Sequence, residues 1–437
     1  MAYTKQTWVN NDATTPLSAT RLNYIEQGIA DAHALAASGG SSTTATPRLG
    51  IVPVASSQLP QSVKDGVAAA GGFVCSGTND QVQINAALLK ASRPADGFGG
   101  EGHIGVQLIG PRFFTASGAA ATAAGSITMY PSTHLMGTGP GTIITPGWST
   151  NAVDRGCIEL LNANTAHVRV SSLTIGAQNA VTIPGHGIRF VQSGQAAAYE
   201  YMTGSDTFHY IDHVSVLKAA RSGIYLTGTA GGNRETQISW CLLWQCQERG
   251  VFFDGSSDCQ ISDCRGTGGG NFPRFELGGG NVKIANCKAY FSGNQDANDG
   301  PTADGFLINS SRVSVVGCDA QDNGRYGFNF TGNNATASGL VADSNSRGTA
   351  TGGGFFISSA GMYSGMHAHN RPQNAITQNR PFIFSGAPKI YLTGRSELSA
   401  ITGTGTHVTG APTGYVRILK DGDAGAASDG HGLYSVG

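Results

Sequence analysis

Alternating apolar residues recur along the middle of the chain behind a small residue, in the order glycine, apolar, any residue, apolar. Two apolar positions separated by one other residue are typical of a β-strand, because successive side chains point to opposite faces. The motif begins at Gly187, Gly223, Gly250, Gly305, Gly327 and Gly354, with variants at Arg274 and Pro381. Successive copies start 22 to 36 residues apart, which predicts one short strand in each unit of a repeat.

A second apolar pattern follows several copies of the first and carries four cysteines in one register. Cys241, Cys264, Cys287 and Cys318 each lie three residues after an isoleucine or a valine. Two strand patterns in phase predict the coils of a parallel solenoid, each about 4.8 Å above the last. The cysteines then form a column of small buried side chains, which we favour over disulfides or a zinc site. We therefore predict an all-β fold, a right-handed parallel β-helix.

The middle residue of each first strand points away from the coil interior, yet several copies of it are apolar. Along the repeats it is Arg189, Tyr225, Phe252, Glu276, Leu307, Asn329, Phe356 and Ile383. Apolar side chains on an outer face need a cover. The cover comes either from loops of the same chain or from another copy of it, and we favour a homotrimer.

Residues 1–38 predict a separate N-terminal arm and helix. An irregular arm contains Trp8, and a helix from Ser18 to about Ala37 carries Leu22, Ile25 and Ile29 at steps of three and four. These steps form the narrow apolar seam of a coiled coil. The helix either lies on the protein's own body or associates with other copies. Residues 39–46 are rich in Gly, Ser and Thr and predict a flexible linker.

The solenoid needs a cap over its first open core. A capped amphipathic helix is predicted over about 80–91, behind Thr78 to Gln81. We place the entry of the β-helix with this helix at 47–145, the coils at 146–400 and a closing segment at 401–437. The closing segment contains one strand-like run, which either closes the last coil or joins strands of several copies.

Composition and charge exclude several classes of protein. Gly supplies 64 of 437 residues and charged residues only 13%, which fits many tight turns and a surface of neutral polar residues. The net charge is −1 without a basic run, so we expect no nucleic-acid partner. No apolar stretch is long enough for a membrane span. We expect no signal peptide, no metal and no cofactor.

Two stretches resemble known families. Thr7 to Ile29 is similar to the start of many tail proteins of actinobacterial phages, where this region attaches the protein to the tail. Gly72–Leu88, Gly105–Gly110 and Leu135–Ile143 resemble the entry of pectate-lyase-like β-helix proteins, and with the coils the likeness covers about 47–400. That superfamily includes pectin-degrading enzymes and trimeric phage tailspikes. The resemblance implies a virion tail protein and assigns Trp8, Leu22, Ile25 and Ile29 to tail attachment and oligomerisation.

Three short motifs are poor candidates for chemistry. Gly137 to Gly141 lacks the third glycine and the following helix of a dinucleotide site. The run Gly185–Gly187 resembles a polygalacturonase motif, but its accompanying aspartates and basic pair are not found. The run Tyr210–His213 resembles a pectate lyase motif without the calcium-binding carboxylates. We expect His186, Asp212 and His213 to be turn or loop residues.

Candidate catalytic residues lie beside the long connections, where insertions of a solenoid form its binding surface. A glycosidase needs two carboxylates about 5–9.5 Å apart, and our candidates are Glu200, Glu276, Asp296 and Asp299. The alternative is ordinary solvated carboxylates, and for Asp304 a turn residue. Tyr199, Tyr201, Tyr225 and Tyr290 are candidate platforms for sugar rings. Trp240 and Trp244 are further candidates for such platforms, but for this pair we favour packing in the core or in an interface.

Three functions follow from these features. The first is a phage tail spike or minor tail protein of the virion, made in the host cytoplasm, which contacts other tail proteins and recognises a host-surface glycan. The second is a polysaccharide hydrolase or lyase on the same scaffold. The third is a spacer without a ligand.

Overall fold

A computed structural model describes most of the chain from residue 50 onward. The described ranges are 50–92, 100–101, 103–115, 125–147, 154–160, 167–176, 183–193, 208–229, 233–293, 303–348, 351–371, 378, 380–386, 389–397, 408–409, 412–421 and 431–436. Contacts divide the chain into two units, Met1–Arg48 and Leu49–Gly437. The predicted arm, N-terminal helix and linker lie outside the described residues, together with Trp8, Leu22, Ile25 and Ile29.

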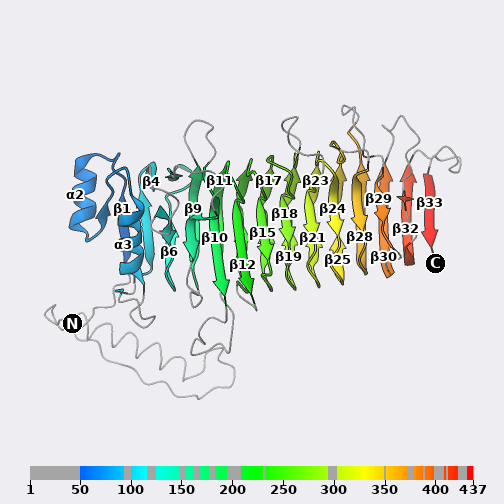
Figure 1. The fold of residues 1–437 in the computed structure, drawn as a ribbon, viewed down its shortest axis with the longest axis horizontal. Coiled ribbons are helices and arrows are strands. Elements are labelled where there is room, and N and C mark those ends of the chain that lie inside the picture. The colour runs from blue at the N-terminus through cyan, green and yellow to red at the C-terminus, as the bar shows by residue number, and fades with distance from the viewer. Residues whose placement is uncertain are drawn as a thin grey trace, which may run out of the picture. The chain divides into compact units, whose positions relative to one another are not determined.

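One wall of the solenoid, sheet B, takes a single strand from each coil, and the strands pair in parallel (Figure 1). Its strands are β5 (Ile127–Thr128), β8 (Gly156–Leu160), β10 (His186–Ser193), β12 (Ile224–Thr229), β15 (Val251–Asp254), β18 (Phe275–Leu277), β21 (Phe306–Ile308), β24 (Tyr326–Phe330), β27 (Gly353–Ile357), β29 (Phe382–Phe384) and β31 (Val408–Thr409). Ile188 pairs with Ile224, and Ile224 pairs with Val251. The predicted first strands therefore lie directly over one another.

The remaining walls form sheet A, which takes one or two strands from each coil. They are β1 (Ile51–Ala55), β2 (Phe73–Val74), β3 (Gly105–Ile109), β4 (Arg112–Thr115), β6 (His134–Met136), β7 (Ile143–Pro146), β9 (Arg169–Gly176), β11 (Tyr210–Leu217), β13 (Gln237–Ser239), β14 (Leu242–Trp244), β16 (Gln260–Ser262), β17 (Arg265–Thr267), β19 (Lys283–Ala285), β20 (Lys288–Tyr290), β22 (Ser314–Val316), β23 (Asp319–Gln321), β25 (Ala335–Ser338), β26 (Val341–Asp343), β28 (Gly361–His369), β30 (Lys389–Glu397), β32 (Thr413–Asp421) and β33 (His431–Val436). The strand β32 pairs in parallel with β30, whereas β33 pairs antiparallel with β32. The strand-like run of the closing segment thus continues the coils of its own chain.

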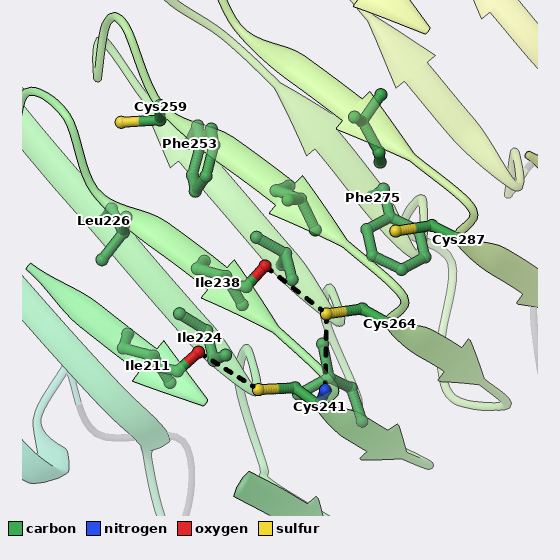
Figure 2. Close-up of a cluster of buried hydrophobic side chains, with 14 of the residues drawn as sticks. Ile211, Ile224, Leu226, Ile238, Cys241, Phe253, Cys259, Cys264, Phe275 and Cys287 are labelled. Carbon is green, nitrogen blue, oxygen red and sulfur yellow. Dashed lines mark hydrogen bonds between the residues drawn. The ribbon is translucent and has the colours of Figure 1, made fainter. Parts of the chain in front are cut away.

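The four predicted cysteines form one column inside the solenoid, and Figure 2 shows Cys241, Cys264 and Cys287 of it. Leu242 pairs with Arg265 and Arg265 with Lys288, so Cys241, Cys264 and Cys287 stack in register. The backbone N–H of Cys241 donates to Sγ of Cys264 at 3.4 Å, and the Cys241 thiol donates to the carbonyl of Ile211 at 3.7 Å. These cysteines are buried and free of disulfides. The sequence prediction of a buried thiol column is confirmed.

A second column consists of phenylalanine rings that point inward from sheet B. Its members are Phe275, Phe306, Phe328, Phe355 and Phe382. Successive ring centroids are 4.8–5.3 Å apart, with nearly parallel planes. The distance between rings follows the distance between coils, so the repeat itself supplies the offset stacking that aromatic pairs favour.

Sharp corners between strands explain much of the glycine and asparagine content. Between β13 and β14 the corner residue Trp240 has φ of 54°, and Asp263 and Asn286 occupy the same place on the next two coils with φ of 55° and 54°. This left-handed conformation favours Gly, Asn and Asp. Gly317 and Gly339 continue the corner with φ of 61° and 62°.

The motif glycine begins each strand of sheet B because the next coil passes very close. A Cβ at Gly250 would lie 2.7 Å from the carbonyl oxygen of Arg274, and one at Gly305 would lie 2.7 Å from that of Gly327. Arg274 is the exception in this column. Its Cβ faces Gly266, where an added Cβ would lie 3.0 Å away, so a glycine on the opposite wall leaves room for the larger side chain.

The N-terminal end of the coils is covered by α3 (Gln81–Ala91), which confirms the helix predicted near 80–91. Ile84 and Leu88 are buried against the first coils. The proposed helix cap is wrong, because the Asp80 carboxylate instead accepts hydrogen bonds from the N–H groups of Gly77 (2.6 Å) and Phe114 (2.8 Å). The helix α2 (Gln61–Ala69) has no counterpart in the sequence prediction.

The outer face of sheet B is covered in good part by residues of the same chain. The ring of Tyr326 stacks on Phe356 at 4.9 Å, and the guanidinium of Arg249 lies 4.1 Å from the ring centre of Phe252. Ile383 is buried. The apolar outward positions therefore do not by themselves require another copy of the chain, and the homotrimer stays a prediction.

Candidate functional site

Charged side chains of five coils form a continuous network on the outer face of sheet B. We call it the ion-pair ladder; it consists of Asp154, Glu159, Arg189, Arg221, Glu248, Arg249 and Glu276. The residues stand on the strands of sheet B or in the turns that lead into them, so the parallel register brings each arginine beside acids of neighbouring coils. Acid and arginine alternate along the stack.

The N-terminal half of the ladder has two arginines, each of which bridges two acids. Arg189 lies 3.0 Å from Asp154 and 3.5 Å from Glu159. Arg221 lies 3.3 Å from Asp154 and donates from Nε to Glu248 at 3.0 Å. Glu159 is completely buried, and the backbone N–H of Gly156 donates to it at 2.7 Å. Because each arginine spans two coils, the ladder ties successive coils together.

Burial and neighbouring charges shift the pKa values of Glu159 and Asp154 in opposite directions. Burial raises the pKa of Glu159, although the Gly156 N–H and nearby arginines counteract it. Burial also acts on Asp154, but the charge of Arg189 and a hydrogen bond from His186 outweigh it and lower the pKa of Asp154. Acids with split pKa values occur in general acid–base sites. Glu159, however, is not accessible to a substrate.

The C-terminal half holds Arg249 between two aromatic rings. Its guanidinium lies 4.1 Å from the ring centre of Phe252 and 4.5 Å from that of Phe272. It also donates from Nε to Glu276 at 2.5 Å and approaches Glu248 at 3.9 Å. Stacking and pairing together fix the arginine in one orientation, and Phe272 remains 38% exposed.

A stack of rings crosses the middle of the ladder. Tyr225 lies 4.9 Å from His186 and 5.2 Å from Phe252 between ring centres, and its hydroxyl donates to Asp254 at 3.1 Å. Tyr225 and Phe252 are half-buried. The rings form a short platform beside the arginines, and such a surface can pack against the apolar face of a sugar while neighbouring groups form hydrogen bonds with its hydroxyls.

His186 orients this platform rather than acting on a substrate. The backbone N–H of Ser222 donates to Nδ1 at 3.2 Å, so Nε2 carries the proton and donates to Asp154 at 3.2 Å. Burial, with the charge of Arg221, lowers the pKa of His186 to about 4. The imidazole is therefore neutral at neutral pH, and it is buried.

A second, smaller cluster lies further along sheet B around Asp304. This buried carboxylate accepts two hydrogen bonds from Arg325 at 2.8 and 2.7 Å, one from Asn329 at 2.8 Å and one from the N–H of Tyr326 at 3.2 Å. A carboxylate held by four donors has no free lone pair pointing outward. Asp304 is a structural turn residue, as the sequence indicated.

The structure brings two of the predicted site residues onto this face. Glu276 and Tyr225 belong to it, but Glu276 is only 9% exposed and its carboxylate is bound by Arg249. Tyr290 lies on β20 of sheet A, half-buried, with Lys288 5.8 Å from its ring centre. Glu200, Asp296, Asp299, Tyr199 and Tyr201 lie outside the described residues. Of the four candidate carboxylates the structure therefore describes only Glu276, and the predicted catalytic residues stay a prediction.

The sequence reasoning missed the arginines of the ladder. Arg221 stands two residues before the motif glycine Gly223, and Arg249 stands directly before Gly250. The register of the motif aligns Arg221 with Glu248 on the next coil, so opposite charges at aligned positions of consecutive repeats were a signal for an ion pair. Trp240 and Trp244 do not pack in the core, because they are 60% and 37% exposed; their packing in an interface stays a prediction.

Other chemistry is not visible in the described ranges. Within them, no group of His, Cys, Asp and Glu is arranged to hold a metal ion. Among the same residues, no helix has the length and apolar character needed to cross a membrane.

Comparison with protein families and curated sequences gives one match. A family model described as a right handed beta helix region matches residues 201–396. A search of curated protein sequences finds no match. The matched region contains most of the coils described above, and the handedness agrees with the prediction.

Solved structures with the same fold include phage proteins and a polysaccharide-modifying enzyme. Full-length tailspike protein 2 of an Escherichia coli O157:H7 bacteriophage has a TM-score of 0.56, with 17% identity over 73% of this chain and 41% of its own. The enzymatically active domain of the bacteriophage CBA120 tailspike protein 2 has a TM-score of 0.58, with 17% identity over 73% of this chain and 46% of its own. The chain thus spans less than half the length of either tailspike.

The third similar structure is the A-module of the mannuronan C-5 epimerase AlgE6 from Azotobacter vinelandii. It has a TM-score of 0.53 and 15% identity over 79% of this chain and 96% of its own. At these identities the likeness establishes the fold, a right-handed parallel β-helix, and leaves the activity to be argued from the site.

Proposed function

We propose that this right-handed parallel β-helix is a tail spike of a bacteriophage, and that the outer face of sheet B binds a polysaccharide of the host cell surface. The fold is shared with two phage tailspike structures. The N-terminal resemblance to phage tail proteins points in the same direction. Because the chain spans less than half of those tailspikes, its place in a virion is part of the proposal.

The observation that carries the binding site is the platform of Tyr225, Phe252 and Phe272 beside the fixed guanidinium of Arg249. Aromatic faces and arginine side chains with few rotamers bind without a large loss of conformational entropy. Our candidates Tyr199, Tyr201, Asp296 and Asp299 belong to the connections before β11 and β21 in the sequence, and they stay part of the proposal.

The test is binding of the full chain to surface polysaccharides purified from a panel of bacterial strains. A polysaccharide bound by the unmodified protein is then offered to Tyr225→Ala and Phe272→Ala. We expect each substitution to weaken binding by about tenfold or more, as for a central aromatic contact. Phe114→Ala, on β4 of sheet A, is the matched control for a half-buried aromatic residue outside this face. Equal loss in the control would point to a general effect on the fold.

The homotrimer also belongs to the proposal. The exposed side chains of Met362, Tyr391 and Tyr415 form one column on neighbouring strands of sheet A. The rings of Tyr391 and Tyr415 stack at 4.9 Å. A contiguous exposed apolar column is typical of an interface, and the N-terminal seam of Leu22, Ile25 and Ile29 provides a second contact between copies.

The alternative function is degradation of the polysaccharide by hydrolysis or elimination. It is favoured by two similar structures, one the enzymatically active domain of a tailspike and the other the A-module of an epimerase. New reducing ends or unsaturated sugars in the bound polysaccharide would establish cleavage. The variants Glu276→Gln, Asp296→Asn, Asp299→Asn and Glu200→Gln then test the candidate acids one at a time. Binding without new ends would leave recognition as the function.

A further inference from the structure

A groove of about 410 Å³ lies on the outer face of sheet A, away from the ion-pair ladder. It runs across four coils, over β13, β16, β19 and β22. Its lining includes Gln237, Ser239, Trp240, Gln260, Ser262 and Lys283. No residue of the ladder contributes to it, so the groove is a feature separate from the site described above.

The repeat gives this groove two regular rows of polar side chains. Gln237 pairs with Gln260 and Ser239 with Ser262, so equal groups recur on successive coils. Lys283 and Ser314 continue the first row, whereas the second row passes into the apolar Ala285 and Val316. Amide and hydroxyl groups both donate and accept hydrogen bonds. Because coils follow at about 4.8 Å, the donors and acceptors recur at about the length of one sugar residue in an extended chain.

Trp240 provides a flat apolar surface at one end of the groove. Its side chain is 60% exposed, which is costly for an indole that could have packed inside. The left-handed corner turns it outward. Its ring stacks on His213, with 6.0 Å between ring centres and an interplanar angle of 15°. The indole is thus oriented as a platform rather than left to rotate in solvent.

The charges around the groove select the kind of ligand. Lys283 is the one charged residue among the described residues that line it. On β11 and β9, Asp212 and Arg169 neutralise each other through hydrogen bonds of 2.8 and 3.1 Å. Asp263 follows Ser262 at the corner and accepts a hydrogen bond from Asn286 at 3.4 Å. A polyanion would meet a single positive charge in the lining, and a basic peptide would meet no acid in it.

We propose that this groove binds an uncharged linear oligosaccharide, laid along the stack of coils with one sugar ring on Trp240. The rows that begin at Gln237 and Ser239 supply the hydrogen bonds to its hydroxyls. A second copy of the chain is a poorer occupant, because the groove exposes little apolar surface besides Trp240 and Val316. The larger apolar column lies on later coils.

The experiment titrates the full chain with cellohexaose, maltohexaose and mannohexaose and records intrinsic tryptophan fluorescence and the heat of binding. We expect at least one of these sugars to bind and Trp240→Ala to weaken its binding by about tenfold or more. Ser262→Arg, which fills the floor of the groove, should have the same effect. Trp244→Ala is the matched control on the same coil and should change the affinity by less than about twofold.

Three results would overturn this proposal. The first is the absence of binding of all three sugars at millimolar concentration. The second is sugar binding that Trp240→Ala leaves unchanged. The third is a change in the mass of the protein in solution caused by Ser262→Arg, which would assign the groove to a second copy. Tyr225→Ala should leave sugar binding in the groove intact, so failure of the sheet B site and failure of this groove are distinguishable.

Discussion

Replacement of the buried Arg274 by methionine should detach a loop from the solenoid. Arg274 is completely buried at the start of β18. Its guanidinium donates to backbone carbonyl oxygens of Cys246, Glu248, Gly268, Gly270 and Phe272. One side chain thus holds the segment from Gly268 to Phe272 against the coil that precedes it, and Phe272 in turn covers Arg249.

The size of the effect follows from the acceptors that methionine would leave without a donor. The carbonyls of Cys246 and Gly268 meet the guanidinium in a fully buried environment, whereas the other three are partly accessible to water. Each buried acceptor without a donor costs about 1–3 kcal/mol, so Arg274→Met should lower the free energy of unfolding by roughly 2–6 kcal/mol. Arg274→Lys keeps three donors and should lose less.

Unfolding in guanidinium chloride and hydrogen–deuterium exchange followed by mass spectrometry measure the two consequences. We expect Arg274→Met to unfold at lower denaturant and to exchange the amide hydrogens of Gly268 to Phe272 faster. Arg265→Met is the matched control, because Arg265 is exposed on β17, and it should change stability by less than about 0.5 kcal/mol. If Arg274→Met also stays within about 0.5 kcal/mol and leaves the exchange of this segment unchanged, the Arg274 hydrogen bonds do not hold the loop.

Four further outcomes are expected. Burial raises the pKa of Cys157 and Cys259 to about 12, so the native protein should not react with a thiol reagent at pH 9. In urea all eight cysteines should react. Rapid labelling of the native protein would contradict the burial of the thiols. Burial lowers the pKa of His209 to about 3 and of His186 to about 4. Below about pH 6.5 the unfolded chain therefore binds protons that the native state does not bind. The denaturant concentration at the unfolding midpoint should decrease as the pH is lowered from 6.5 to 4. His209→Gln should flatten that pH dependence, and an unchanged slope would argue against it. Phe306→Ala should cost about 3–5 kcal/mol, measured by denaturation. Light scattering should give three times the chain mass, and Tyr391→Lys should reduce it to that of one chain; a wild-type protein of single-chain mass would exclude the homotrimer.

The repeating part of the fold was predictable because solenoid coils turn sequence distance into spatial contact. The spacing of Cys241, Cys264 and Cys287 specified a register, and that register is the one observed. The same logic would have found the column that contains Phe275 and Phe306. The predicted cap of the helix near 80–91 failed because the Asp80 carboxylate accepts a hydrogen bond from Phe114 on a neighbouring strand. The sequence near the helix does not show this partner.

The candidate site was harder to predict because its contacts lie between residues at unequal offsets. Arg249 meets Glu276 on the next coil and Phe272 in the loop before it, and a one-dimensional pattern does not give both partners. The exposure of Trp240 has a similar cause. A residue that follows a strand continues it or turns a corner, and only the left-handed backbone observed here turns the indole outward.

The connections between strands have a consequence for how such a protein changes over time. Successive copies of the strand motif start 22 to 36 residues apart, yet Ile188 and Ile224 still pair across the longest interval. A difference in the length of a connection is therefore compatible with an unchanged register of the strands. A connection from a different solenoid, placed between the same two strands, should transfer its recognition properties while the scaffold beneath it stays as it is.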